Sequence, residues 1–446
     1  MKSQLPVYAR DMMSALPWWK RLHCRLMFLL ADTFRFWRRP KKMNPDPVNW
    51  PKGPLPPYWF YKSKKHILLP EKGSDLDSHF KSYQDRNGPF TPKGFREEKR
   101  MRLSAVGDLM NAKGMKHSGG KFYAHVSDLI FGADISIANL ESTLTSYPVQ
   151  ETVFSAEETP KINATPEEYN ALKGHEGRQY TIFHTANNHI LDCGKEGFDT
   201  THDVIEAEGF LFVGTNRTPE EQKKGRLVIS NGIKFGFVAA TYGLNSRPFP
   251  EGKKWLVNHV PFHKLGGKTD LSLLEEQINW CRSEQCDAIV VSLHWGLEFE
   301  LYPWKEQLEI AHALVEAGAD AILSHHTHNI QPYELYQTRR DPDRIAPILY
   351  GLGNLASIMS SPFNALSLIA NLEFVKGQNN DTKKTFVKDV RITPVIQIEK
   401  KQEDGFFLQI QPLKDLLADP GDITDTAYLN KAAHYADLAL GAGWRS

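Results

Sequence analysis

The stretch Ser324-His325-His326-Thr327-His328-Asn329 follows directly on the apolar run Ala321-Ile322-Leu323. An apolar run that ends in a polar cluster is typical of a buried strand, because open α/β sheets place their sites beyond the carboxyl ends of their strands. Neutral imidazole is a common metal ligand, and alternate residues of an extended loop can point at one ion. The stretch therefore predicts a metal site in an α/β fold. The alternative is a histidine-rich surface turn.

Composition indicates an ordinary globular protein. The chain has 446 residues, a formal net charge of +1 and 41% hydrophobic residues. A nearly neutral chain offers no strong field for a nucleic acid, so we expect no nucleic-acid partner. The four cysteines show neither the CxxC spacing of a zinc site nor a disulfide framework, which fits a reducing compartment. We expect a cytoplasmic protein, because we find no signal-peptide pattern and no apolar stretch of about 18 residues.

Residues 1–100 differ in composition and residue pattern from the rest of the chain. Between residues 18 and 42, basic side chains alternate with Trp, Phe and Leu. On a helix this mixture predicts peripheral contact with an anionic membrane, which would make the protein membrane-associated. The alternative is an amphipathic helix packed on the chain's own core, with its arginines reaching solvent. Seven prolines between Pro40 and Pro57 then indicate an extended connector.

Other apolar runs repeat the pattern of the histidine stretch. Five runs, each typical of a core strand, end in side chains that can bind a metal ion. These side chains are Asp108, Asn139 with Glu141, Asn188 with His189, His294, and His326 with His328. Each is weak evidence alone, because a turn, a helix cap or a hydrogen-bonded core histidine would look the same. Together they predict one site at the carboxyl ends of several strands.

The residue types indicate which ion such a site would hold. Carboxylates, amides and imidazoles without cysteine favour Mn, Fe or Zn and allow Mg or Ca. At least three histidines, with carboxylates that can bridge, are enough ligands for two ions. We therefore expect one or two divalent metal ions. Two ions about 3.5–4 Å apart would clamp the attacking and leaving oxygens of a hydrolysed bond.

Eight short motifs occur along residues 101–375. They are Gly107-Asp108-Leu109-Met110, Ala138-Asn139-Leu140-Glu141, Ala186-Asn187-Asn188-His189-Ile190-Leu191-Asp192-Cys193-Gly194, His294-Trp295-Gly296-Leu297-Glu298, Gly318-Ala319-Asp320, His325-His326-Thr327-His328, Gln331-Pro332-Tyr333-Glu334 and Tyr350-Gly351-Leu352-Gly353-Asn354. In this order they resemble the motifs of the CapA capsule-synthesis family, a branch of the calcineurin-like metallophosphoesterases. The resemblance implies a four-layer α/β/β/α sandwich over residues 101–400. Residues 1–100 would be an extension outside the family, and residues 401–446 a tail with short helices.

The resemblance also assigns roles to individual residues. The metal ligands that it implies are Asp108, Glu141, Asn188, His294, His326 and His328. His189 would assist the leaving group with Asp192 orienting it, and Glu298 would be a general base or a substrate contact. The remaining substrate contacts would be Asn139, His325 and Asn354, and the alternative for His325 is to support a metal ligand without binding the metal itself. The ordinary alternatives are a turn-forming aspartate at Asp192 and a solvated charge at Glu298.

Two departures from the superfamily pattern weaken the expectation of a simple phosphatase. Ordinary members carry Asp-x-His where this chain has Met110 after Asp108, and an aspartate where this chain has Asn139. One ligand is therefore lost, which fits a single metal ion, or one strong and one weak site.

These features predict a metal-dependent hydrolase that acts on a phosphoester or a glutamyl-type amide. Its substrate would be an anionic small molecule, a peptide or a polymer. One alternative is a non-catalytic, polymer-binding accessory component of a capsule-synthesis complex. Another is metal-assisted acid/base chemistry at a peptide α-carbon. The link to poly-γ-glutamate capsule synthesis rests on the resemblance alone.

Overall fold

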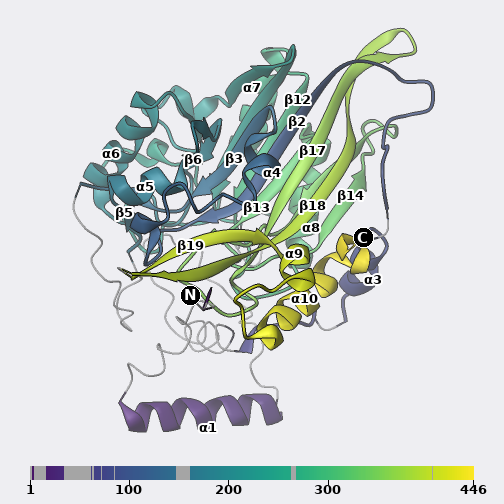
Figure 1. The fold of residues 1–446 in the computed structure, drawn as a ribbon. Coiled ribbons are helices and arrows are strands. Elements are labelled where there is room, and N and C mark those ends of the chain that lie inside the picture. Colours follow the sequence, from purple (N-terminus) through teal and green to yellow (C-terminus); the bar gives the residue numbers. More distant parts are fainter. Residues whose placement is uncertain are drawn as a thin grey trace.

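The structure is a computed structural model that describes residues 3–4, 17–34, 62, 65–71, 73–84, 86–146, 161–262, 268–403 and 405–445. The core of the structure consists of two β-sheets and the helices that cover them (Figure 1). The proline-rich connector expected between Pro40 and Pro57 lies outside the described residues.

The first sheet has nine strands and is mixed. Its parallel part consists of β2 (Arg96–Leu109), β3 (Ile135–Leu140), β8 (Ile182–His184), β9 (Leu211–Val213) and the short β16 (Asn354–Ala356) beside β2. Its antiparallel part consists of β17 (Leu366–Asn379), β18 (Thr382–Gln402), β19 (Gly405–Pro412) and β1 (Ser3–Gln4). The boundary expected near residue 400 therefore falls inside β18, and the tail contributes β19 to the sheet.

The second sheet has six strands. Its central strands β11 (Ile233–Thr241), β12 (Ala288–His294), β13 (Ala321–His325) and β15 (Ile345–Leu349) are parallel. Antiparallel edges are formed by β10 (Arg226–Ser230) and β14 (Tyr333–Gln337). Every residue of β12 is buried, which explains its continuous apolar sequence, because a parallel strand is covered on both faces.

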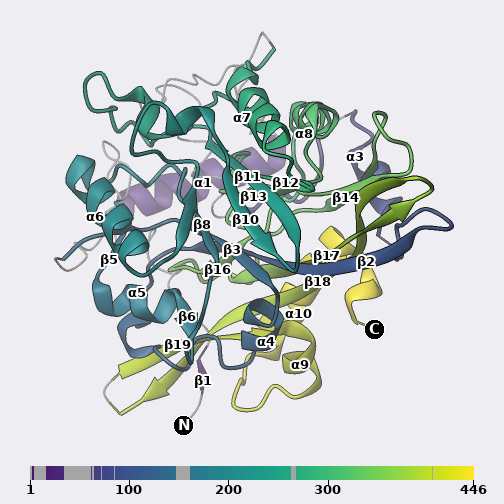
Figure 2. The ribbon, with the colours of Figure 1, turned by 90° about the horizontal axis from the view of Figure 1, so that it is seen from above.

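Helices cover the outer faces of both sheets (Figure 2). One hydrophobic cluster joins side chains from both sheets to α7 (Ser272–Ser283) and α8 (Lys305–Ala317). A second cluster joins the opposite face of the nine-stranded sheet to α4 (Ser127–Phe131), α5 (Pro166–Leu172) and α6 (Gly194–Ala207). The order of layers is therefore helix, sheet, sheet, helix. The mixed α/β fold and its four layers are confirmed.

The remaining elements lie around this sandwich. The helices are α1 (Trp18–Phe34), α3 (Leu76–Lys81), α9 (Leu413–Ala418) and α10 (Thr426–Leu440), and the short strands are β4 (Thr143–Leu144), β5 (Asn163–Ala164), β6 (Gly174–His175) and β7 (Arg178–Gln179). Single 3₁₀ turns are η2 (Met115–His117), η3 (Glu221–Lys223), η4 (Lys254–Leu256) and η5 (Ala442–Arg445). Among the described helices, none has the length and apolar character needed to cross a bilayer.

Candidate metal centre

The candidate site lies where parallel strands of both sheets end. The strands β2, β3 and β8 run parallel in one sheet, and β12 and β13 run parallel in the other. Asp108 lies near the end of β2, Glu141 follows β3, and His294 ends β12. Because the carboxyl ends of parallel strands meet at one edge of a sheet, these side chains come together although they are far apart in sequence.

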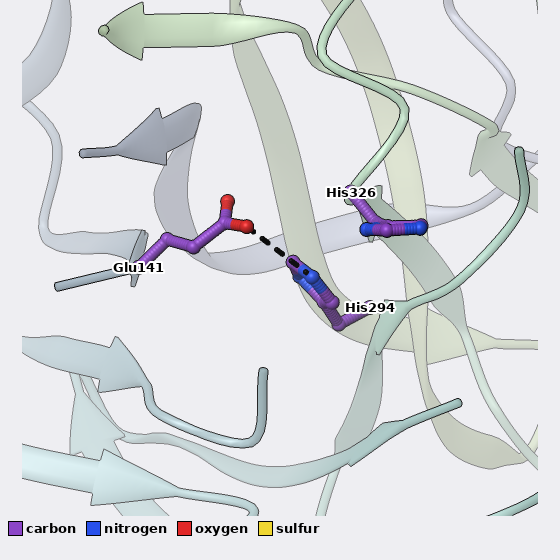
Figure 3. A group of neighbouring side chains, drawn as sticks. All are labelled: Glu141, His294 and His326. Atoms are coloured by element: carbon purple, nitrogen blue, oxygen red, sulfur yellow. Dashed lines mark ion pairs between the residues drawn. The ribbon is translucent and has the colours of Figure 1, made fainter. Parts of the chain in front are cut away.

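Glu141, His294 and His326 lie near one another at three strand ends, and Glu141 and His294 point toward each other (Figure 3). Glu141 Oε1 lies 3.5 Å from His294 Nε2. One ligand atom from each of the three residues lies within 4.8 Å of the other two. All three residues are buried. The three side chains form a buried group at the junction of the two sheets that could hold a metal ion.

Two further groups overlap with this one. They consist of Asp108, Glu141 and His328, and of Glu298, His326 and His328. The backbone after β13 is left-handed at His326 (φ 87°) and at His328 (φ 55°). This conformation is uncommon for residues other than glycine, and such residues cluster at functional sites. Here it brings both imidazoles into the overlapping groups.

Asp108 is held by several donors. Its Oδ1 accepts a hydrogen bond from Asn139 Nδ2 at 2.8 Å and lies 3.1 Å from His325 Nδ1, and its Oδ2 accepts the backbone N–H of His326 at 3.3 Å. Burial alone would raise the pKa of Asp108, but His325, His328 and the Asn139 amide hold it below the ordinary value. Asp108 therefore stays an anion, the form that binds a cation.

The charge of Glu141 is not fully compensated by its neighbours. Burial raises the pKa of Glu141 well above its ordinary value, and the Asp108 carboxylate raises it further. Its Oε1 is buried and accepts no hydrogen bond from the described part of the chain. A buried carboxylate oxygen of this kind is costly unless a cation or donor contacts it.

The histidine next to Glu141, His294, also favours a bound cation. Burial, together with His326 and the other nearby histidines, lowers the pKa of His294 well below its ordinary value. The imidazole is therefore neutral, the form that binds a metal. The Asp108 anion beside the neutral imidazole of His294 fits a divalent ion.

Two asparagines support this group. Asn188 Oδ1 lies 2.8 Å from His294 Nε2, so these two expected ligand atoms are in hydrogen-bond contact. Asn139 Nδ2 donates to Asp108, lies 3.4 Å from Glu141 Oε2 and 3.2 Å from His294 Nδ1. Asn139 is completely buried. Its amide therefore contacts the expected ligands directly.

His189 and Asp192 form a pair beside the cluster. His189 Nδ1 lies 2.6 Å from Asp192 Oδ2, and His189 Nε2 lies 3.8 Å from Glu141 Oε1. Asp192 also accepts the backbone N–H of Ile162 at 2.7 Å, and Arg247 Nε lies 3.4 Å from its Oδ1. Because a carboxylate accepts, Nδ1 carries the proton of the neutral ring and Nε2 faces the cluster. Asp192 is thus placed where it orients His189.

Glu298 and Asn354 lie on the side of His328. Glu298 Oε1 is 3.9 Å from His328 Nε2, and its side chain is 19% exposed. Burial raises the pKa of Glu298, while His328 and Lys62 oppose this shift. Asn354 Oδ1 lies 3.0 Å from His328 Nδ1, and its Nδ2 donates to the His328 carbonyl at 3.3 Å. Asn354 therefore fixes the orientation of His328, and Glu298 is the more accessible of the two.

The N-terminal extension reaches the loop that carries Glu298. The backbone N–H of Ile67 donates to the Phe299 carbonyl at 2.9 Å, and the N–H of Leu301 donates to the Ile67 carbonyl at 2.8 Å. Lys62 is buried, with its Nζ 3.4 Å from Glu300 Oε1. Residues outside the family motifs therefore form part of the surroundings of the site.

His325 differs from the other two members of its cluster. It is in none of the three potential metal-binding groups of the described residues. Its Nδ1 contacts Asp108, its Nε2 is buried without a hydrogen bond to any described residue, and its ring lies edge-on to His184 at 5.3 Å. Burial lowers the pKa of His184 to about 3. The contact between its Nδ1 and Asp108 shows that His325 supports this carboxylate. Because His325 is 1% exposed, it has almost no surface for a substrate.

Two residues of the site carry no sequence signal that we recognised. Asn245 Oδ1 accepts from Asn188 Nδ2 at 3.1 Å, and Asn245 Nδ2 lies 3.3 Å from His189 Nε2. The Tyr242 ring lies 4.3 Å, between centroids, from the His326 ring. Both follow β11, which is parallel to β12. The rule that strand ends carry the site, applied to β11 as well, would have found them.

Known proteins resemble this chain in sequence. The capsule biosynthesis protein CapA of Bacillus anthracis is 25% identical over 287 residues, which cover 61% of this chain and 64% of that protein. The PGA biosynthesis protein CapA of Bacillus subtilis is 26% identical over 259 residues, 56% of this chain and 62% of that protein. The chain thus spans less than two thirds of the length of these relatives.

The chain is also similar to a solved structure and to a family model. A calcineurin-like phosphoesterase, YfkN from Bacillus subtilis, aligns with a TM-score of 0.37 and 15% identity over 77% of this chain and 98% of that one. The family model described as bacterial capsule synthesis protein PGA_cap matches residues 102–359, more than half of the chain. The resemblance expected from the motifs is confirmed, and the chain belongs to the PGA_cap family of bacterial capsule synthesis proteins.

Proposed function

We propose that this protein is a metal-dependent hydrolase of a phosphoester or a glutamyl-type amide. The observation that carries the proposal is the buried group of Glu141, His294 and His326, whose ligand atoms lie within 4.8 Å of one another. Asp108 and His328 extend this group, and Asn188 faces it through His294. These six side chains would hold one or two ions, of which Mn, Fe and Zn suit the donors best and Mg and Ca are alternatives.

A divalent ion in this position supplies Lewis-acid polarisation of a phosphoryl or carbonyl oxygen. The chain's own residues supply proton transfer. His189 keeps Nε2 toward the cluster because Asp192 holds Nδ1 at 2.6 Å. When protonated, Nε2 can donate its proton to the leaving group of the substrate. Asp192 stabilises the imidazolium, and Glu298, at the more accessible side, would accept a proton or contact the substrate.

The substrate that we propose is anionic, either a small molecule or a glutamyl peptide or polymer. Two curated relatives are described as capsule or PGA biosynthesis proteins, and the family carries the same description. A γ-glutamyl chain presents one carboxylate per residue. Arg247, beside Asp192, is a cation that lies close to the pair proposed to transfer the proton.

Metal analysis of one matched pair of variants tests the proposal. Purified protein should contain Mn, Fe or Zn, and His326→Ala should lose it. His434→Ala, at an exposed histidine of α10, is the control and should retain it. An activity screen over phosphoesters and γ-glutamyl peptides should then show turnover that His326→Ala and chelation both abolish. Stoichiometric metal in the His326→Ala variant would refute the site.

A second candidate is a non-catalytic accessory component that binds the polymer. It is favoured by Met110, which stands where ordinary phosphoesterases carry a histidine. A relative in Mycobacterium tuberculosis, 24% identical over 230 residues, is described as a probable polyglutamine synthesis accessory protein. Binding of γ-glutamyl polymer that survives metal removal, without turnover of any tested ester or peptide, would favour this function.

A further inference from the structure

Helix α1 (Trp18–Phe34) carries most of the exposed large hydrophobic side chains of the described residues. Nine large hydrophobic side chains are exposed among the described residues, and six of them are on this helix. The six are Trp18, Trp19, Leu22, Leu26, Met27 and Leu29. Elsewhere in the described residues, most such side chains are buried in the hydrophobic clusters, so this concentration calls for an explanation.

The exposed side chains form a continuous stripe. Trp18 (74% exposed), Leu22 (60%), Leu26 (53%) and Leu29 (62%) follow one another at intervals of four, four and three residues. At 3.6 residues per turn these positions lie on one face of the helix. Since this face is exposed, it does not pack on the chain's own core, which was the alternative for this segment. In Figure 1, α1 lies beyond the two sheets, at the edge of the molecule.

Most charges around the stripe are positive, and Asp32 is the one acidic residue of the helix. Arg25 is exposed one position before Leu26, and Arg21 precedes Leu22. In the sequence, Arg35, Arg38, Arg39, Lys41 and Lys42 follow the helix. A helix with a polar, basic side and a Trp- and Leu-rich side is suited to the boundary between lipid head groups and acyl chains. With 17 residues, α1 is shorter than the 20 or so that span a bilayer.

We propose that α1 binds in the plane of an anionic lipid surface, with the stripe of Trp18, Leu22, Leu26 and Leu29 in the acyl boundary and the basic side chains at the head groups. This inference is separate from the proposed hydrolase, because none of its residues belongs to the metal centre. Its consequence is that the enzyme would act at a membrane. The competing occupant of the stripe is a second copy of this chain, for which the clustering of positive charge is unfavourable.

Co-sedimentation of the full chain with vesicles tests the proposal. We expect binding to phosphatidylcholine vesicles that contain about 30% phosphatidylserine, and at least about tenfold weaker binding to phosphatidylcholine alone. The double variant Leu22→Glu/Leu26→Glu should bind the anionic vesicles at least about tenfold more weakly, because it removes two apolar side chains and adds two negative charges. Arg25→Gln should weaken binding by about fivefold.

The matched control is Leu69→Glu/Ile229→Glu. Leu69 and Ile229 are 71% and 69% exposed, outside α1, and the control adds the same two charges. It should bind vesicles to within about twofold of the unchanged protein. The proposal is overturned if the unchanged protein stays in the supernatant, or if the control loses as much binding as the α1 variant. It is also overturned if lipid-free protein forms a dimer that Leu22→Glu/Leu26→Glu dissociates while vesicle binding is unchanged.

Discussion

Replacing Glu141 by glutamine tests whether the buried cluster is built around a cation. The substitution removes a buried carboxylate, one oxygen of which lies within 4.8 Å of an oxygen of Asp108. In metal-free protein these two groups repel each other, whereas a bound cation would attract both. We therefore expect Glu141→Gln to make the metal-free protein more stable and to weaken metal binding.

The size of the effect follows from the geometry. Two unit charges at 4.8 Å repel by about 3.5 kcal/mol at an effective dielectric constant of about 20. Protonation of Glu141 limits this cost, and Asn139, which donates to its Oε2 at 3.4 Å, offsets part of it. The free energy of unfolding should therefore rise by about 1–3 kcal/mol at pH 7. Metal affinity should fall by at least about 100-fold.

The difference in free energy of unfolding between Glu141→Gln and the unchanged protein should grow as the pH rises. Glu141 has a raised pKa in the folded protein, whereas in the unfolded chain it titrates near its ordinary value of 4.5. Below that value both states are protonated and the variant has no charge to remove. As the pH rises above 4.5 the unfolded chain releases the proton first, so the unchanged metal-free protein loses stability relative to the variant. The difference becomes constant above the folded-state pKa.

Glu300→Gln is the matched control. Glu300 is also buried, but its Oε1 lies 3.4 Å from Lys62 Nζ. Removing the negative member of a buried ion pair should lower the free energy of unfolding by about 3 kcal/mol. Urea unfolding of chelator-treated protein, followed at several pH values, measures both variants. If Glu141→Gln is destabilised as Glu300→Gln is, the cluster is a satisfied polar core and not a cation site.

Three further predictions concern neighbouring groups. Asp192→Asn should lower turnover by about 100-fold with metal content unchanged, because His189 loses the acceptor that fixes its tautomer; loss of the metal instead would place Asp192 among the ligands. Lys62→Met should lower the free energy of unfolding by about 3 kcal/mol and Lys62→Arg by much less; equal losses in urea unfolding would show that charge is not what Lys62 contributes. Glu334 is held by His312 Nε2 at 2.8 Å, and although burial opposes the shift, its histidine partners lower its pKa from 4.5 to about 2. Above pH 4.5 the lowered pKa of Glu334 stabilises the fold by about 3 kcal/mol, and this contribution is lost as the pH falls toward 2. Glu334→Gln should therefore lower the free energy of unfolding by about 3 kcal/mol at pH 7. Below pH 4 the loss should be much smaller, which acid unfolding measures.

The sequence predicted the location of the site because its signal is local. A parallel strand covered on both faces is continuously apolar, as in Ala288–His294, and the first polar residue after it marks the edge where a site forms. The same rule predicts that one cluster contains Asp108, Glu141, His294 and His328. It works because each of these four residues lies within three residues of a strand end, whereas Asn188 follows the end of β8 by four residues.

Contacts between distant segments were not predictable in the same way. Lys62 reaches Glu300 across 238 positions, and nothing in its local sequence distinguishes it from other lysines of the extension. The assignment of Asn139, His325 and Asn354 to substrate contact likewise came from motif positions. In the structure all three are almost fully buried and contact the expected ligands. Only packing decides whether a polar side chain beside a site faces the substrate or another side chain.

The charges of the cluster decide how many ions it holds tightly. One divalent ion would neutralise Asp108 and Glu141. A second ion at His326 and His328 would add only Glu298, whose side chain is 19% exposed and whose pKa burial raises. Met110, buried where ordinary members carry a histidine, offers only a thioether. We therefore expect one tight ion and a second bound at least about 100-fold more weakly. Equilibrium dialysis against a competing chelator measures both, and two equally tight ions would show that another side chain replaces the missing histidine.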